Sequence, residues 1–332
     1  MMALKKFLGA LLVGVFVFVG LVLPVQAQQG GKGLKIKMAG FPGGGTGFLI
    51  TVGLREGIFK KHGVKRLRAV FPERDLEAFA YGAINSAFLN AAEVASLRIR
   101  GWEVAQEGPG LVGYSHIWTL KGKPYQSLMD LKGKKFAHFG WDSGSTTEFL
   151  VLAKSLFNFD VRNELKHVIV PPPAVKKVLD RGDVEAALVP LGPAIALELE
   201  PEKYQKIWGP FTDAWRKKTG SPIFTAALAV NEEILERPRL ARSLSMAVQE
   251  IVRFVLAEPY GVMKKYQWYF GYNDAKANQF AKAMQEGRIF SAEWNDKVVD
   301  AQWEFIRTAA AMKVYLKRLP PGGRDGLFRV YQ

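Results

Sequence analysis

The feature of this chain that most restricts its fold is an alternation of strands and helices that occurs twice in the same order. The first copy runs from a strand at Leu34–Met38 to a strand at Ala83–Leu89. The second runs from Phe136–Phe139 to Ala186–Val189 and ends in a loop at Pro190–Pro193. Each copy contains a helix, a strand and a second helix closed by a glycine turn. This alternation predicts mostly parallel sheets, with loops gathered at the carboxyl ends of the strands.

Two extended segments separate these copies from each other and from the C-terminal part. They lie at Leu111–Leu120 and Ser221–Val230, and we interpret them as connections that leave the first sheet and return to it. After the second segment the apolar residues recur at helical spacing, which predicts helices at Asp274–Glu286 and Ala292–Met312. The tail Gly322–Gln332 is expected to be extended.

The stretch Asp130–Leu150 carries the most specific local signal. Ser145 and Glu148 have the S-x-x-E spacing of a capping box, which predicts that a helix begins at Ser145. A helix start offers unpaired N–H groups and a partial positive charge, and Ser143 and Thr146 add hydroxyls beside it. These residues favour a small anionic or strongly polar ligand. The alternative is an ordinary capped helix in an α/β sheet.

The loop Phe41–Gly47, F-P-G-G-G-T-G, follows the first strand directly. Three consecutive glycines allow the backbone to approach another group closely. No Gly-Lys-Ser/Thr follows, and the spacing is not that of a dinucleotide-binding fingerprint, so neither nucleotide site is predicted. We expect a loop of close approach at the carboxyl end of a strand.

Charge and length leave several partner classes open. The chain has 332 residues, 48% of them hydrophobic, and a formal charge of +15. This charge permits nucleic acid, anionic lipid or an anionic small ligand as partner. Basic residues are spread along the chain apart from a cluster at Lys60–Arg68, and no nucleic-acid-binding motif accompanies it. We therefore interpret the cluster as a solvated face and expect no nucleic acid partner.

The N-terminus reads as an export signal. Lys5 and Lys6 precede the apolar run Phe7–Leu23, and Val25-Gln26-Ala27 supplies a signal-peptidase site, so cleavage is expected after Ala27. The alternative is an uncleaved membrane anchor. The sequence contains no cysteine, which excludes disulfides, thiolate metal sites and a lipid-modified cysteine after cleavage. We therefore predict a periplasmic protein without a lipid anchor.

No catalytic, metal or cofactor pattern stands out. The histidines show no metal-ligand spacing, and Ser143-Gly144-Ser145 is not the G-x-S-x-G of a nucleophile elbow. His138 lies on a predicted buried strand, where it is expected to be a core histidine. We predict no catalytic residue, no metal and no cofactor. Asp142 leaves a zwitterionic or cationic ligand open, because its carboxylate could orient an amine.

Three motifs carry a resemblance to a known family. They are L-R-E-G-I-F-K-K-H-G-V at Leu54–Val64, D-L-K-G-K-K-F-A…G-S-T from Asp130, and D-R-G-D-V-E-A-A-L-V-P at Asp180–Pro190. In order and spacing they resemble the nitrate/sulfonate/taurine/thiamine-precursor family of periplasmic solute-binding proteins of ABC transporters. The resemblance covers essentially the whole chain after the signal peptide. One departure is Asn85-Ser86, since family members commonly carry an aspartate in this strand.

The resemblance implies a two-lobed α/β fold of the periplasmic binding protein type II class. Each lobe would be a mixed, mostly parallel sheet flanked by helices, with ligand in the cleft between the lobes. Residues 1–27 would be the signal peptide, 28–120 and 223–332 the discontinuous first lobe, and 121–222 the second lobe. The two extended segments would be the crossings between lobes.

The resemblance also places a ligand site. Carried over residue by residue, the family's ligand loops and crossing strands fall on Gly44, Gly45, Thr46, Asn90, Tyr114, His116, Ser143, Gly144, Ser145, Thr146, Leu191, Gly192 and Phe224. Trp141 could wall an apolar part of the ligand. For each aromatic residue, packing in the core is the alternative.

The function that follows is capture of a small anionic solute, such as a sulfonate, nitrate or carboxylate, for delivery to an ABC permease by a monomer. A binding protein for an aromatic ligand or a thiamine-precursor pyrimidine, one for a TRAP-type importer, and a sensor that docks to a receptor are alternatives. An enzyme on the same fold is disfavoured. A relative that makes the thiamine pyrimidine uses a cysteine-rich metal site, and this sequence contains no cysteine.

Overall fold

The computed structural model describes residues 34–72, 75–141 and 143–331. Residues Lys35–Gln332 form one compact unit, and everything below concerns that unit. The predicted signal peptide, its cleavage site after Ala27 and the side chain of Asp142 lie outside the described residues. Along the described parts of the chain, no helix combines the length and apolar character needed to cross a membrane.

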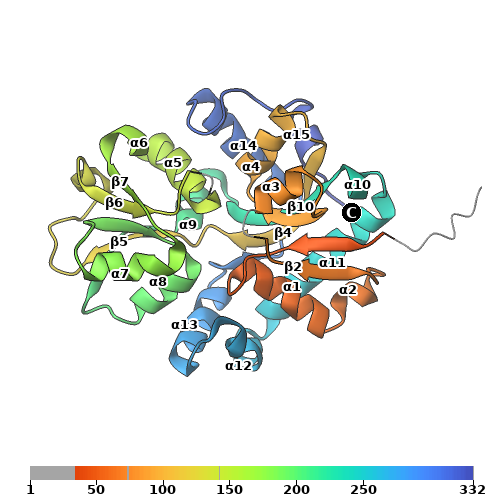
Figure 1. Cartoon of the computed structure of the whole chain (residues 1–332), viewed down its shortest axis with the longest axis horizontal. Helices are drawn as coiled ribbons and strands as arrows, with labels where there is room; N and C mark the ends of the chain where they lie inside the picture. Colours follow the sequence, from red (N-terminus) through yellow and green to blue (C-terminus); the bar gives the residue numbers. More distant parts are fainter. Residues whose placement is uncertain (1–33, 73–74, 142, 332) are drawn as a thin grey trace, which may run out of the picture. The chain divides into compact units, whose positions relative to one another are not determined.

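The first sheet has six strands in the order β11-β4-β10-β3-β1-β2 (Figure 1). Strand β1 is parallel to β2 and β3, whereas β10 is antiparallel to β3 and β4 and the short β11 is antiparallel to β4. The strands are β1 Ile36–Ala39, β2 Leu67–Val70, β3 Ser86–Leu89, β4 Val104–Val112, β10 Phe224–Asn231 and β11 Phe290–Ser291.

The second sheet has five strands in the order β7-β6-β8-β5-β9. Strand β6 is parallel to β7 and β8, and β5 is antiparallel to β8 and β9. The strands are β5 His116–Leu120, β6 Lys135–His138, β7 Lys166–Ile169, β8 Ala186–Val189 and β9 Tyr204–Trp208.

Both sheets therefore contain the same unit: three parallel strands with the first of the chain in the middle, followed by an antiparallel strand, β10 or β5. This confirms the predicted α/β class with two mixed sheets, and the fold is the two-lobed one. The predicted segment Leu111–Leu120 is divided, because β4 pairs in the first sheet and β5 in the second. The chain thus crosses at residues 113–115. Residues 116–120, which the sequence-based bounds assigned to the first lobe, pair with the second sheet.

Helices flank both sheets (Figure 1). Around the first sheet, α1, α2 and α11 contact one another, as do α4, α14 and α15. Their bounds are α1 Gly45–Arg55, α2 Ile58–Lys61, α3 Asp75–Ala80, α4 Ala91–Ile99, α10 Glu232–Leu235, α11 Pro238–Ala257, α12 Pro259–Phe270, α13 Asp274–Gln285, α14 Asp296–Ala311 and α15 Gly323–Leu327. Around the second sheet lie α5 Gly144–Phe157, α6 Val161–Glu164, α7 Val175–Asp180, α8 Leu191–Glu198 and α9 Phe211–Thr219, with 3-10 turns at Leu128–Leu131 and Pro172–Ala174.

The longest helix, α11, shows how the sequence pattern produces this packing. Pro238 occupies its first turn, where a missing N–H costs nothing. Leu244, Val248, Ile251 and Val255 recur at helical spacing and are fully buried. They form the stripe by which α11 packs against β4 and α1.

Several predicted elements are corrected by the structure. Pro190–Pro193 is not a loop, because Pro190 is the N-cap of α8 and Pro193 lies in its first turn, where proline is tolerated. Strand β9 and helices α9 and α12 were not predicted. The tail is not simply extended, since it contains α15 and then pairs Phe328 with Gln106 in a parallel bridge.

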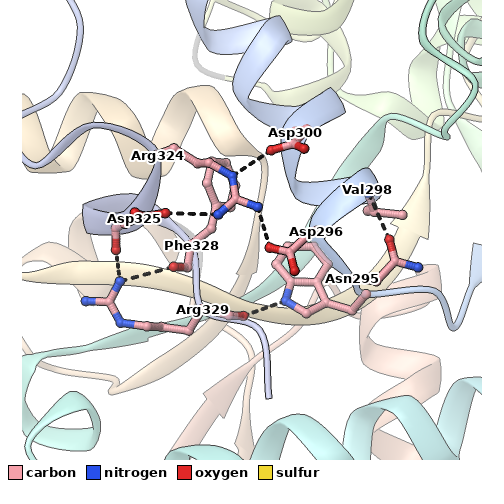
Figure 2. A network of polar contacts seen from close by, with 9 residues as sticks. Asn295, Asp296, Val298, Asp300, Arg324, Asp325, Phe328 and Arg329 are labelled. Carbon is pink, nitrogen blue, oxygen red and sulfur yellow. Dashed lines mark hydrogen bonds and ion pairs between the residues drawn. The ribbon is translucent and has the colours of Figure 1, made fainter. Parts of the chain in front are cut away.

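Figure 2 shows how the tail is attached. The Arg324 guanidinium donates to Asp296 and Asp300 of α14, each at 2.6 Å, and to Asp325 at 2.9 Å. The Trp294 indole N–H donates to the Arg329 carbonyl at 2.7 Å. The C-terminal segment is therefore tied to the start of α14 by both charge and backbone contacts.

Candidate functional site

Four helices begin where parallel strands end. Helix α1 follows β1, α4 follows β3, α5 follows β6 and α8 follows β8. Strands β1 and β3 are neighbours in the first sheet, and β6 and β8 are neighbours in the second. Because the carboxyl ends of neighbouring parallel strands lie at one edge, the starts of α1 and α4 are adjacent, and so are those of α5 and α8.

The structure brings these two pairs of helix starts together. A Cβ atom on Gly45 would lie 3.3 Å from Cδ2 of Leu191, so α1 and α8 begin in contact. The Asn90 side-chain amide donates to the Gly144 carbonyl at 3.2 Å, which joins α4 to α5. A Cβ on Gly144 would lie 3.0 Å from the Thr225 carbonyl oxygen. At Gly144 this approach to a backbone oxygen leaves little room for a side chain.

We call these residues the helix-start cluster. It comprises Gly44, Gly45, Thr46, Asn90, Ser143, Gly144, Ser145, Thr146, Leu191 and Gly192. All of them were candidate ligand residues in the sequence, and the structure gathers them at the four helix starts. Their role in ligand binding stays a prediction.

The start of α5 differs from the predicted capping box. Helix α5 begins at Gly144 with Ser143 as N-cap, so Ser145 is already inside the first turn. Glu148 does not reach back to the helix start; its carboxylate accepts from the Thr225 hydroxyl at 3.0 Å instead. Ser145 accepts from the Ser115 hydroxyl at 2.9 Å. The Thr225 hydroxyl thus supplies the hydrogen-bond donor that a buried acid requires.

A true capping box lies at the neighbouring helix start. The Asn90 side chain accepts from the Glu93 N–H at 2.8 Å, and the Glu93 carboxylate accepts from the Asn90 N–H at 2.7 Å. At the start of α1, the Thr46 hydroxyl accepts from the Phe41 N–H at 2.9 Å, which closes the glycine loop. These bonds fix the starts of α1 and α4. The first N–H groups of each helix have no partner within their own helix.

Several polar atoms beside the cluster have no partner among the described residues. The hydroxyls of Thr146 and Thr147 are fully buried and unpaired, and so is one carboxyl oxygen of Glu148. Burial raises the pKa of Glu148 to about 8, with the Thr225 hydrogen bond opposing it. The acid is therefore largely protonated at neutral pH. Buried polar atoms without partners are costly, so they mark a place where a partner is supplied from elsewhere.

Tyr114 lies on the first crossing segment, and His116 is the first residue of β5. The Tyr114 hydroxyl donates to Glu198 of α8 at 2.8 Å, and Gln279 of α13 donates to the same carboxylate at 2.9 Å. His116 packs edge-on against Tyr114 at 4.8 Å between ring centroids. Burial, aided by Lys206, lowers the pKa of His116 well below its usual value, so the ring is neutral. Both side chains are buried, and Glu198 ties the crossing to helices of both sheets.

Gly192, in the first turn of α8, faces an unpaired hydroxyl. A Cβ on Gly192 would lie 3.6 Å from the Tyr272 oxygen, and this buried oxygen has no hydrogen-bond partner in the described part of the chain. Burial raises the pKa of Tyr272, so its hydroxyl stays protonated and able to donate. Tyr272 was not singled out from the sequence.

Trp141 lies just before α5 in an aromatic group of its own. Its ring lies 4.4 Å from His138 and 4.7 Å from His167, centroid to centroid, and the Arg162 guanidinium lies 5.1 Å above it. Burial lowers the pKa of His138 to about 4, and His167 adds to the effect. Trp141 lines a cavity of about 400 Å³, which is discussed below.

The side chain of Phe224 lies in the core. Its ring is buried in the core and packs against Trp294 at 5.8 Å, while its N–H donates to Gln302. The core-packing alternative describes this residue. The described residues contain no group of three or more histidine or acidic side chains that could hold a metal ion.

Sequence reasoning missed the residues that surround the cluster from other elements. Thr225, Ser115 and Tyr272 lie far apart in the chain and belong to no motif. Only Glu148 carried a signal, as an acid within an otherwise apolar helix face, and that signal was interpreted as a cap.

Comparisons with known proteins agree with this geometry at the level of the fold. No protein-family model matches the sequence, and no curated protein is similar to it in sequence. The alkanesulfonate-binding protein SsuA from Xanthomonas axonopodis pv. citri, bound to MOPS, superimposes with a TM-score of 0.69 at 13% identity, covering 90% of this chain and 98% of that one. The periplasmic nitrate-binding protein NrtA from Synechocystis PCC 6803 gives 0.64 at 11% identity, covering 89% and 85%.

One similar structure is not named as a binding protein. A DszB variant in complex with biphenyl-2-sulfinic acid gives a TM-score of 0.62 at 13% identity, covering 89% of this chain and 96% of that one. The structures similar to this chain thus include sulfonate- and nitrate-binding proteins, and the resemblance inferred from the three sequence motifs is confirmed as a likeness of fold.

Proposed function

We propose that this protein is an exported, periplasmic solute-binding protein that takes up a small anion, sulfonate-, nitrate- or carboxylate-like, at the helix-start cluster and delivers it to an ABC permease. The observation that carries the proposal is the meeting of four helix starts from two sheets. Each start contributes unpaired N–H groups and a partial positive charge, so the place where they meet favours negative charge. The fold comparisons support the same class of function.

The unpaired polar atoms support an anion more specifically. The Thr146 and Tyr272 hydroxyls and the protonated form of Glu148 are all hydrogen-bond donors without an acceptor in the described structure. Hydrogen bonds to a charged group each contribute about 1.5–3 kcal/mol. A few such donors can therefore hold a small anion without a neutralising arginine.

The experiment is a thermal-shift screen against small anions, alkane sulfonates, aromatic acids, amino acids and pyrimidines. A ligand that binds only the folded protein stabilises it by RT ln(1 + [L]/Kd), about 2.7 kcal/mol at a hundredfold excess over Kd. An anion should raise the melting temperature, and the combined Ser145→Ala and Thr146→Ala variant should lose that shift.

The matched control is Ser155→Ala. Ser155 lies on the same helix, at its other end, where its hydroxyl accepts from Lys218 at 2.9 Å. This variant should keep the full ligand-induced shift. A shift retained by the helix-start variant would contradict the proposed site. A ligand that is consumed rather than recovered intact would contradict a binding role and indicate an enzyme.

A further inference from the structure

An aromatic surface outside the core lines the cavity that contains Trp141. This cavity measures about 400 Å³, within the range of small-molecule sites. One wall comes from α3 and α4 and the segments that follow them, and the other from Trp141 and α6. Its aromatic and basic lining residues are Tyr81, Trp102, Trp141, Tyr315, Arg100 and Arg162.

Two aromatic residues of the first wall are exposed to water. Tyr81 is 78% exposed and Trp102 is 37% exposed, and their rings meet edge to face at 5.8 Å between centroids. Large rings left in water at the mouth of a cavity mark a surface that a ligand can cover, because covering them releases ordered water.

The charge of the cavity selects the ligand. Among the described residues, neither Arg100 nor Arg162 has a carboxylate within ion-pair distance, and Arg162 rests on the Trp141 ring. A guanidinium stacked on an indole keeps its edge N–H groups available for a carboxylate or sulfonate. Glu77 also lines the cavity, and its negative charge disfavours a ligand with several negative charges.

We propose that this cavity binds a planar aromatic monoanion, an aryl sulfonate or aryl carboxylate, whose ring packs against Trp102 and Trp141 and whose anionic group meets Arg162. This site is distinct from the helix-start cluster and shares with it only the loop that carries Trp141. Binding at this cavity therefore does not depend on the proposed function of the helix-start cluster.

The test is isothermal titration of the purified protein with three probes. Naphthalene-2-sulfonate has both ring and charge, methanesulfonate has only the charge, and benzylammonium has a ring with the opposite charge. Naphthalene-2-sulfonate should bind at least tenfold more tightly than benzylammonium. Trp102→Ala and Arg162→Gln should each weaken naphthalene-2-sulfonate at least fivefold. Neither variant should change methanesulfonate binding.

The structure offers a matched control pair. Arg55 lies 4.7 Å over the ring of Trp268, which is 52% exposed, so the pair repeats the arginine–indole contact on α1 and α12. Arg55→Gln and Trp268→Ala should leave naphthalene-2-sulfonate binding unchanged. Because Trp102 is partly exposed, its variant should fold, and an unchanged melting temperature checks this.

Three results would overturn the inference. One is no binding of naphthalene-2-sulfonate, and another is an equal loss in the control pair, which would indicate general adhesion to exposed indoles. The third is binding that survives Arg162→Gln and Trp102→Ala but is lost in the Ser145→Ala and Thr146→Ala variant. That result would place the aromatic anion at the helix-start cluster and leave the proposed function standing.

Discussion

At the scale of single residues, the helix-start cluster contains buried polar groups that lower the stability of the folded protein. Thr146 is the clearest case, because its hydroxyl is fully buried and has no partner in the described structure. A buried hydroxyl without a hydrogen bond costs about 1–3 kcal/mol. Such a residue persists where its cost is offset by a use in binding.

Replacing this hydroxyl should separate stability from binding. Thr146→Val keeps the shape of the side chain and removes the unpaired group, so the ligand-free protein should gain about 1 kcal/mol of unfolding free energy. The same variant should weaken anion binding. Thr212→Val is the control, since Thr212 is equally buried and unpaired but lies at the start of α9. It should stabilise the protein and leave binding intact, as measured by denaturant unfolding and ligand titration.

Glu148 predicts a dependence of stability on pH. Burial raises its pKa from 4.5 to about 8 in the folded protein. Between these values the folded state holds a proton that the unfolded state has lost, so stability falls as pH rises. The loss from this group is at most about 1.4 kcal/mol per pH unit crossed. Glu148→Gln should remove this slope and have the higher melting temperature at pH 8.

Measuring the stability of the unmodified protein and of Glu148→Gln across pH 5–8 separates the contribution of Glu148 from that of other groups. Glu107 is also buried and its pKa is raised to about 7, so it contributes a slope of the same sign in both proteins. Parallel stability curves for the two proteins would show that Glu148 titrates normally, contrary to the prediction.

At the scale of elements, α4 begins with a cap that also reaches across to the second sheet. Asn90 accepts from Glu93 within its own helix and donates to the Gly144 carbonyl. Asn90→Ala should lose both, at a cost of about 1–2 kcal/mol for the cap alone. Asn273 caps α13 by accepting from the Lys276 N–H and makes no side-chain contact to the second sheet among the described residues, so Asn273→Ala should cost less. Chemical denaturation of the two variants measures the difference.

The sequence predicted elements well where local signals agreed with the pairing. Strand β8 has its predicted bounds, and α5 differs from its prediction by one residue at its start. Glycines at positive φ, such as Gly82 and Gly182, ended helices as expected because other residues rarely adopt that conformation. In these places a short window of sequence contains the whole physical cause.

Other elements could not be predicted because their cause lies far away in the chain. Strand β9 is an edge strand whose one partner, β5, precedes β6 in the sequence. Helix α12 is rich in aromatic residues and contains Gly261, so its helix propensity is low and packing against α13 decides its structure. For the same reason the helix starts were found from the sequence, whereas Thr225, Glu198 and Tyr272 were not.

At the scale of the whole molecule, Gly113 is the residue where the two crossing segments meet. A Cβ there would lie 3.0 Å from Cγ2 of Ile223, 3.1 Å from the Glu148 carboxylate and 3.3 Å from the Thr212 nitrogen. The outgoing segment, the returning segment and two helices of the second lobe are therefore in contact at one point.

Filling this point should be costly. Gly113→Ala forces these groups apart and should destabilise the protein by about 1–3 kcal/mol. Gly261→Ala is the control, because a Cβ at this helical position meets nothing closer than 4.0 Å. The control should be stabilising by about 0.5–1 kcal/mol, since alanine is the better helix former. Equal melting temperatures for the two variants would show that the crossings can separate without cost.

The order of strands in the first sheet also determines when that sheet can form during synthesis. Strand β10 lies between β3 and β4, although it leaves the ribosome long after both. The second sheet, by contrast, uses only strands between residues 116 and 208 and can be completed earlier. In a nascent chain, the strands of the second sheet are therefore all present before those of the first sheet. Its N-terminal strands stay without a complete sheet until most of the polypeptide has been made.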